Sequence, residues 1–220
     1  MEKDIKEKKT QPIYTLGEEL ISSISHGIGA GLGVAALVLC IIKGAQNGSA
    51  FDVTSAAIYG AALVILYTIS CIYHALCPGK GKRVLRIIDH CSIFLLISGT
   101  YTPFTLVSLR GPIGWTLFGI VWGATILGVT LNAINVHRFR IFSMICYLMS
   151  GWVIIFAFIP LTKVMETAGI ILLILGGVAY TIGAVLYGIG KKVKYIHSVF
   201  HFFVLLGSIL HFFTVYFYVL

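Results

Sequence analysis

Charged residues are scarce in this chain of 220 residues. Asp, Glu, Lys and Arg together make up 11% of it, whereas a soluble domain carries about 25%. The charges stand in short clusters. The apolar stretches between them run to about 20 residues or more, the length that a helix needs to cross the hydrocarbon core of a bilayer. The shortage of charge therefore excludes a soluble globular domain and predicts a polytopic membrane protein.

Other signals are missing as well. The first 19 residues mix charges of both signs and lack the short apolar core and the cleavage site of a secretory signal. The 5 cysteines show no C-x-x-C spacing and lie mostly in apolar segments, which favours a packing role. The net charge of +8 belongs to the connections between apolar stretches, so no nucleic-acid partner is expected. We expect residues 1–19 to be a cytoplasmic tail.

What the sequence does contain is seven apolar segments. We expect membrane spans at about residues 20–42, 53–76, 87–108, 114–136, 140–160, 168–190 and 195–219. The connections are short and carry helix breakers such as Pro78-Gly79 and Gly111-Pro112, which makes successive helices antiparallel neighbours. Residues 20–220 are thus expected to form an all-α bundle of seven transmembrane helices, with no separate soluble domain.

Basic residues gather on one side of this arrangement. Thirteen of the 16 Lys and Arg residues lie in the N-terminal segment and in the second, fourth and sixth connections, whereas Lys43, Arg110 and Lys163 lie on the opposite side. Because Lys and Arg are enriched in cytoplasmic loops, this asymmetry predicts that the N-terminus is inside and the C-terminus outside.

Two patterns predict local geometry within the spans. Pro103 is expected to kink the third span, with Thr100 and Thr102 available to satisfy the freed backbone groups. Small residues also recur at four-residue spacing, which lets helix backbones approach closely in lipid. These pairs are Gly27 and Gly31, Gly29 and Gly33, Ala57 and Ala61, Gly119 and Gly123, and Ala124 and Gly128.

Four ionisable residues interrupt the apolar segments. They are His74, Asp89, His197 and His201. A strongly polar group in hydrocarbon is costly and usually persists only with a partner and a function. From the predicted topology and a rise of 1.5 Å per residue, all four occupy a slab about 10 Å deep near the cytoplasmic face. A common depth does not by itself bring them into contact.

The types of these residues suit a metal site. His197 and His201 are spaced i and i+4 and share one helix face, and His74 could add a third imidazole. Three neutral imidazoles with an open fourth position are typical of catalytic zinc, which lowers the pKa of its bound water to about 7. Asp89 could accept a proton from that water, and Ser70, four residues before His74, could orient the substrate or a water.

Simpler explanations remain open for several polar residues. Asp89 could pair with Arg86, three residues away on the same helix. His211, deeper in the last span, is expected to bond to a backbone carbonyl or a serine. His26 continues a polar stripe with Glu19, Ser22 and Ser23 on the first span. We expect this stripe to line a cavity that it shares with the metal site, with His26 and Glu19 as candidates for supporting the metal ligands.

The polar motifs follow one another in a fixed order along the spans. They are Glu19 with Ser22-Ser23-Ile24-Ser25-His26-Gly27, then Ser70-Cys71-Ile72-Tyr73-His74, Asp89-His90-Cys91-Ser92-Ile93-Phe94, Gly99-Thr100-Tyr101-Thr102-Pro103-Phe104 and His197-Ser198-Val199-Phe200-His201. Together they resemble the motifs of bacterial hemolysin III proteins, which belong with the progestin and adiponectin receptor family of seven-span proteins. The resemblance covers essentially the whole bundle.

The resemblance implies a zinc ion bound by three histidines, which map onto His74, His197 and His201. It also implies that Asp89 lies near the metal-bound water and that Ser70 matches the family's serine. Eukaryotic receptors of this family are associated with ceramidase activity, and the wider superfamily includes alkaline ceramidases. An inside N-terminus is expected for the adiponectin receptors, in agreement with the charge asymmetry.

We therefore expect a multi-pass protein of the cell membrane with a Zn²⁺ site near the cytoplasmic face, acting as a hydrolase of lipid amides or esters. Membrane lipid is the expected environment and a possible substrate, and the sequence gives no oligomeric state. One alternative is a lipid-sensing or signalling protein in which zinc is structural. Another is a cytolytic or channel protein, as the hemolysin name suggests, and haem bound by histidines on facing helices is a further one.

Overall fold

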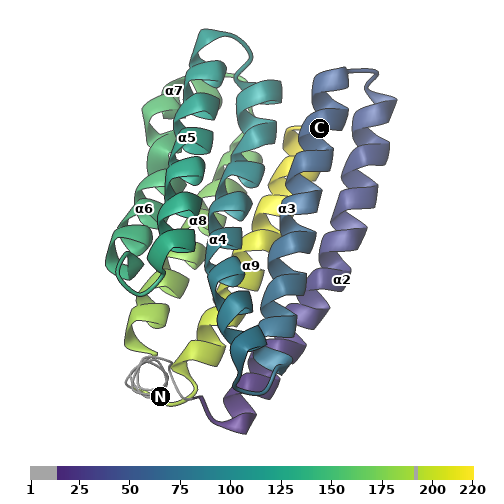
Figure 1. Ribbon diagram of the computed structural model, residues 1–220. Coiled ribbons are helices and arrows are strands. Elements are labelled where there is room, and N and C mark those ends of the chain that lie inside the picture. Colours follow the sequence, from purple (N-terminus) through teal and green to yellow (C-terminus); the bar gives the residue numbers. More distant parts are fainter. Residues whose placement is uncertain (1–13, 191–192) are drawn as a thin grey trace.

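The computed structural model describes residues 14–190 and 193–220. Most of the predicted tail, residues 1–13, and Lys191 and Lys192 of the sixth connection lie outside the described residues. Among the described residues, seven helices are long and apolar enough to cross a membrane (Figure 1). The predicted all-α, seven-span bundle is confirmed.

The spans differ in how regular they are. Single α-helices form α2 (Leu16–Gln46), α3 (Ala50–Ala75), α5 (Pro112–Asn135), α8 (Thr167–Ile189) and α9 (Ile196–Tyr218). The third span joins α4 (Lys80–Pro103) to the π-helical turn η1 (Phe104–Ser108). The fifth span joins α6 (Arg140–Trp152), the 3₁₀ turn η2 (Val153–Ala157) and α7 (Phe158–Thr162).

Helix α2 begins four residues before the expected span because Thr15 and Glu18 form a capping box. The Thr15 hydroxyl accepts from the Glu18 N–H at 3.3 Å, and the Glu18 carboxylate accepts from the Thr15 N–H at 2.8 Å. Glu18 also accepts from the backbone N–H of Tyr195 at 2.7 Å, which ties the start of α2 to the start of α9. As a result Glu19, which we assigned to the tail, lies in the first turn of a membrane helix.

The third span changes helix type at the predicted proline. Pro103 has no N–H to continue the α-helical ladder, and the π-helical turn η1 follows it directly. Thr102 donates to the Ser98 carbonyl at 2.7 Å and Thr105 donates to the Tyr101 carbonyl at 3.0 Å. Both hydroxyls thus donate to backbone carbonyls of the same span, whereas Thr100 lines the interior cavity described below.

Close helix approach occurs at only part of the predicted small-residue faces. A Cβ on Gly29, which is in a predicted pair, would lie 2.5 Å from the Tyr67 ring. Outside the predicted pairs, a Cβ on Gly60 would lie 2.5 Å from the Leu37 Cα. For three other glycines the prediction of a close contact is wrong, because no atom lies within 4 Å of an added Cβ. These are Gly31, Gly119 and Gly123. Spacing defines a helix face but does not show whether another helix covers it.

Helix α9 closes the bundle. It packs against both α8 and α2, so the last span lies beside the first (Figure 1). Because successive helices are antiparallel, the starts of α2, α4 and α9 and the end of α3 meet at the end of the bundle that carries the N-terminus, hereafter the N-terminal end. Polar residues that are far apart in the sequence can therefore lie close together at this end.

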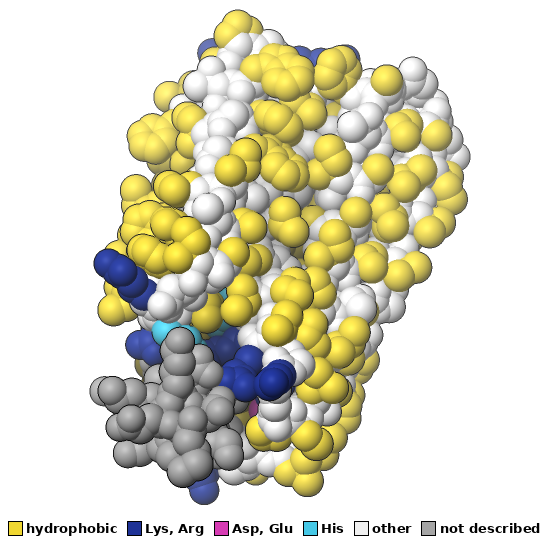
Figure 2. Space-filling model, in the orientation of Figure 1, with side chains coloured by type: hydrophobic (Ala, Val, Ile, Leu, Met, Phe, Trp, Pro, Cys, Tyr) yellow, Lys and Arg dark blue, Asp and Glu magenta, His cyan; other side chains and the backbone are white. Residues whose placement is uncertain are grey.

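The outer surface fits a lipid environment. Figure 2 shows hydrophobic side chains spread along the flank of the bundle and Lys and Arg gathered at its ends. Large apolar side chains such as Phe156, Ile134 and Ile126 are 85%, 70% and 68% exposed. Such a surface would be costly in water and is the expected one in hydrocarbon.

The orientation of the bundle in the membrane stays a prediction and can be measured. A reporter enzyme that is active only outside the cell should be active when fused after Leu220 or Gly111 and inactive when fused after Asn135, because the basic connections are retained inside. The reverse activity pattern would show that the charge asymmetry does not set this topology.

The glycine contacts predict a matched pair of substitutions. Gly60→Ala should lower the thermal unfolding temperature of the detergent-solubilised protein, because overpacking against Leu37 costs about 1–3 kcal/mol. Gly119→Ala, in open space, should change stability by less than about 1 kcal/mol. Equal effects of the two substitutions would contradict the described α2–α3 packing.

Candidate metal centre

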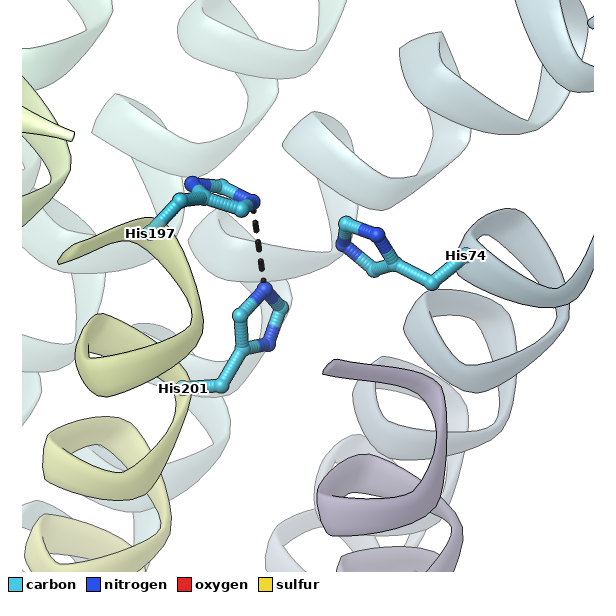
Figure 3. A group of neighbouring side chains, drawn as sticks. All are labelled: His74, His197 and His201. Atoms are coloured by element: carbon cyan, nitrogen blue, oxygen red, sulfur yellow. Dashed lines mark hydrogen bonds between the residues drawn. The ribbon is translucent and has the colours of Figure 1, made fainter. Parts of the chain in front are cut away.

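Three buried histidines converge at the N-terminal end of the bundle. His74 comes from the last turn of α3, and His197 and His201 come from the first two turns of α9. Their candidate ligand atoms all lie within 4.8 Å of one another, and the Nε2 atoms of His197 and His201 are 3.2 Å apart (Figure 3). The three side chains are no more than 5% exposed. Tertiary structure thus brings together the residues that shared only a predicted depth.

Helix α2 contacts two of these rings through their Nδ1 atoms. The Glu19 carboxylate lies 2.7 Å from Nδ1 of His74, and Nε2 of His26 lies 2.8 Å from Nδ1 of His201. Glu19 and His26 are seven residues apart and therefore face the same side of α2. Because each Nδ1 is engaged, Nε2 is the nitrogen that His74 and His201 have left for the centre of the cluster.

A lysine completes this support. Lys82 Nζ donates to the second oxygen of Glu19 at 2.6 Å and to the Leu76 carbonyl at 2.9 Å, so one carboxylate joins His74 to a buried ammonium. The sequence analysis counted Lys82 only as one of the loop charges. No sequence signal distinguishes it from its basic neighbours, because its role depends on where α2 begins.

The other residues of the polar stripe on α2 fasten helices together. Ser22 hydrogen-bonds with Ser198 of α9 at 3.3 Å, and Ser23 donates to the Cys71 carbonyl of α3 at 3.0 Å. The stripe therefore has two uses. Glu19 and His26 reach the histidines, and the two serines position α2 against the helices that carry them.

The histidine cluster opens into an interior cavity of about 170 Å³. Ser70, Asp89 and His26 line this cavity together with the three clustered histidines, whereas Glu19 stands behind the lining. Ser70 lies beside the half-buried Asp89 carboxylate. All seven residues selected from the sequence therefore gather at one place, and their chemical roles stay predictions.

The alternative partners proposed for two polar residues have different outcomes. Among the described residues Asp89 forms no ion pair with Arg86, whose guanidinium instead lies 3.5 Å from Nε2 of His137. His211 does bond to the backbone as predicted, with its Nε2 3.1 Å from the Leu173 carbonyl. Asp89 is therefore available to the cavity.

Tyr14 is a cavity residue that the sequence analysis missed. Its ring stacks on His197 with centroids 4.2 Å apart and planes inclined by 12°, and it lines the cavity. Burial raises the pKa of the Tyr14 phenol, so its hydroxyl stays protonated at neutral pH. Nothing in the charged N-terminal segment signals this contact, which follows from the Thr15 cap that begins α2.

The donor set of the cluster suits a metal ion. Three imidazoles and no thiolate are the ligands of open zinc sites, and other imidazole-preferring ions share this preference. Within the part of the chain that the structure describes, His74, His197 and His201 form a group that could hold such an ion. The side of the cluster that faces the cavity is where a further ligand would enter.

Comparison with known proteins extends the resemblance over the whole bundle. A family model described as Haemolysin-III related matches residues 14–212. The chain is 41% identical to "Hemolysin-3" of Bacillus cereus over 97% of both chains. It is 43% identical to "Hemolysin-3 homolog" of Bacillus subtilis over 94% of this chain and 96% of the relative.

A more distant relative is human. The chain is 22% identical to the "Monocyte to macrophage differentiation factor" of Homo sapiens over 83% of this chain and 77% of the relative. No solved structure matches this chain. The matched segment begins at Tyr14 and includes every residue of the histidine cluster and its supports.

The geometry predicts the metal content of variants. His201→Ala and His74→Ala should each lose a stoichiometric metal ion from the purified protein, because each removes one of three ligands. Glu19→Gln should keep the ion but bind it about 10–100-fold more weakly, since the His74 ring loses its carboxylate partner. Elemental analysis and a chelator titration measure both effects.

His137→Ala is the control, since its exposed imidazole lies outside the cluster. It should keep the full metal content. If His74→Ala also kept it, α3 would not contribute a ligand and the three-histidine site would be wrong.

Proposed function

The chain belongs to the Haemolysin-III related family, and we propose that it is a zinc-dependent hydrolase of lipid amides or esters. The seven apolar helices and the family together support a multi-pass location in the cell membrane. The observation that carries the proposal is the convergence of three buried histidines and one carboxylate on a single apolar cavity.

The fit to zinc rests on the support of the ligands as much as on their number. His74 and His201 each have Nδ1 engaged by a group on α2, which fixes the ring orientation and leaves Nε2 for an ion. Three histidines without a thiolate are typical of catalytic zinc, whereas structural zinc sites are closed by a fourth protein ligand. When bound, zinc would supply Lewis acidity that lowers the pKa of water and draws charge from a carbonyl oxygen.

Asp89 is the residue that would accept the proton from the attacking water. Its carboxylate lines the cavity and lies near His74 and Ser70. A carboxylate in this place could take a proton from a water on the metal ion. Ser70 would then position Asp89, in addition to orienting the substrate or a water as its spacing to His74 predicts.

The walls of the cavity indicate a lipid substrate. The surface of the cavity is mostly apolar, and aliphatic side chains from α3, α4, α6 and α9 share it with aromatic rings. The aliphatic residues include Leu66, Ile93, Leu96, Ile97, Leu148 and Val204. An acyl chain would bury its apolar surface among these residues, with its carbonyl carbon beside the histidines. Tyr14, stacked on His197, would help to exclude bulk water from the reacting carbonyl.

A second candidate is a lipid-sensing protein in which zinc is structural. It is favoured by the way the cluster joins α3 to α9, because an ion held there would fasten two helices that are distant in sequence. In that case chelation would lower thermal stability and no lipid would be cleaved. Leakage from vesicles without a hydrolysis product would instead favour a cytolytic activity.

The proposal predicts separate effects on metal content and turnover. Asp89→Asn should keep the metal ion and lower the rate of ceramide or ester hydrolysis by about 10²–10⁴-fold, the usual contribution of a general base. Product release from lipid in detergent micelles, measured by mass spectrometry, tests this. Full turnover by Asp89→Asn would exclude the assigned role of the carboxylate.

Asp52→Asn is the matched control. Asp52 is also an aspartate and is 5% exposed, but it pairs with Arg110 at 3.1 Å at the opposite end of the bundle. This variant should keep both metal content and turnover, although it should be less stable to heat. If wild type carried zinc and cleaved none of the lipids tested, the structural alternative would be favoured.

A further inference from the structure

The cavity has a second polar feature far from the histidine cluster. His211 lies ten residues after His201 on α9, which corresponds to about 15 Å along the helix axis. Its side chain lines the same cavity, and the residue is 8% exposed. An imidazole at this depth is costly in an apolar interior unless its polar atoms find partners.

Only one of the two ring nitrogens of His211 is satisfied. Nε2 lies 3.1 Å from the Leu173 carbonyl, so it carries the proton of the neutral ring and donates it. Nδ1 is then an acceptor, and it is buried with no hydrogen-bond partner among the described residues. The ring edge formed by Cδ2 and Nε2 packs on Gly176, where an added Cβ would lie 2.4 Å from Nε2. Nδ1 is therefore on the opposite edge.

The polar neighbours of His211 are already paired with one another. Tyr180, whose ring lies 5.3 Å from that of His211, shares a hydrogen bond of 2.7 Å with Ser208. On the other wall Trp152 donates to Thr181 at 3.0 Å, and Thr181 donates to the Gly177 carbonyl at 2.8 Å. Among the described side chains that line the deep end of the cavity, Nδ1 of His211 is thus the buried acceptor without a donor.

We propose that the deep end of the cavity is a subsite for a hydroxyl group, and that Nδ1 of His211 accepts its hydrogen bond. A hydroxyl is a neutral donor and suits an apolar chamber. An ammonium would lose its hydration there, and a carboxylate or ketone brings no donor. The ligand is then an aliphatic chain with a hydroxyl about 15 Å from the group at the histidine cluster.

The placement of a carbonyl at the histidine cluster rests on the proposed function, but the hydroxyl subsite does not. It needs only the cavity, the buried Nδ1 and an aliphatic chain that fills the space between. Binding can therefore be measured without turnover, on metal-loaded or chelated protein. The subsite and the hydrolase activity can fail separately.

Displacement of a fluorescent fatty acid from the purified protein tests the subsite. Wild type should bind 12-hydroxyoctadecanoic acid roughly five- to tenfold more tightly than octadecanoic acid, the gain from one buried hydrogen bond. 2-Hydroxyoctadecanoic acid, whose hydroxyl lies beside the carboxyl group, should show no such gain at the deep end. Equal affinity for the 12-hydroxy and unsubstituted chains would overturn the proposal and favour a water molecule on Nδ1.

His211→Phe removes the acceptor and keeps a planar ring. It should abolish the preference for the 12-hydroxy chain and still bind octadecanoic acid. His137→Phe makes the same change at an exposed site and should keep the preference. A preference that survived in His211→Phe would assign the hydroxyl to another residue. If His211→Phe does not fold, the comparison of the three acids in wild type still decides the matter.

Discussion

Two contacts from the first span, Glu19 with His74 and His26 with His201, set the geometry on which the candidate site depends. In an apolar bundle an imidazole cannot rely on water to satisfy it, so each ring nitrogen must find a protein partner or a ligand. By engaging one nitrogen of each ring, α2 turns the other toward His197. The same helix is secured to α9 through Glu18 and Ser198, so ring orientation and helix packing are coupled.

The cavity follows the same constraint, because its polar groups also need partners in an apolar interior. The histidine cluster lies toward one end of it and His211 toward the other, with mostly apolar surface between. Near Pro103, where α4 gives way to a π-helical turn, Thr102 and Thr105 donate to backbone carbonyls and Thr100 lines the cavity. A long apolar chamber with a polar group at each end is suited to a chain molecule that carries two polar groups.

Much of the fold followed from the sequence because the bilayer simplifies the problem. Apolar runs of sufficient length must be helices, and short connections make them antiparallel, so the seven spans could be predicted. Helix contacts could not be predicted in this way. Gly29 and Gly119 belong to the same kind of pattern, yet Gly29 meets the Tyr67 ring and Gly119 faces open space. The four-residue spacing shows that one face of a helix carries small residues, but it does not show which helix packs against that face.

The sequence by itself determined the class of the protein, the number of spans and the set of polar residues that a membrane interior would tolerate only for a purpose. It also supplied the spacing that puts His197 and His201 on one face. Only the tertiary structure decided that α3 and α9 bring His74 to them, that Lys82 supports Glu19, and that Tyr14 stacks on His197. These contacts join residues far apart in the chain, and they depend on where α2 begins and how it turns, which local sequence does not specify.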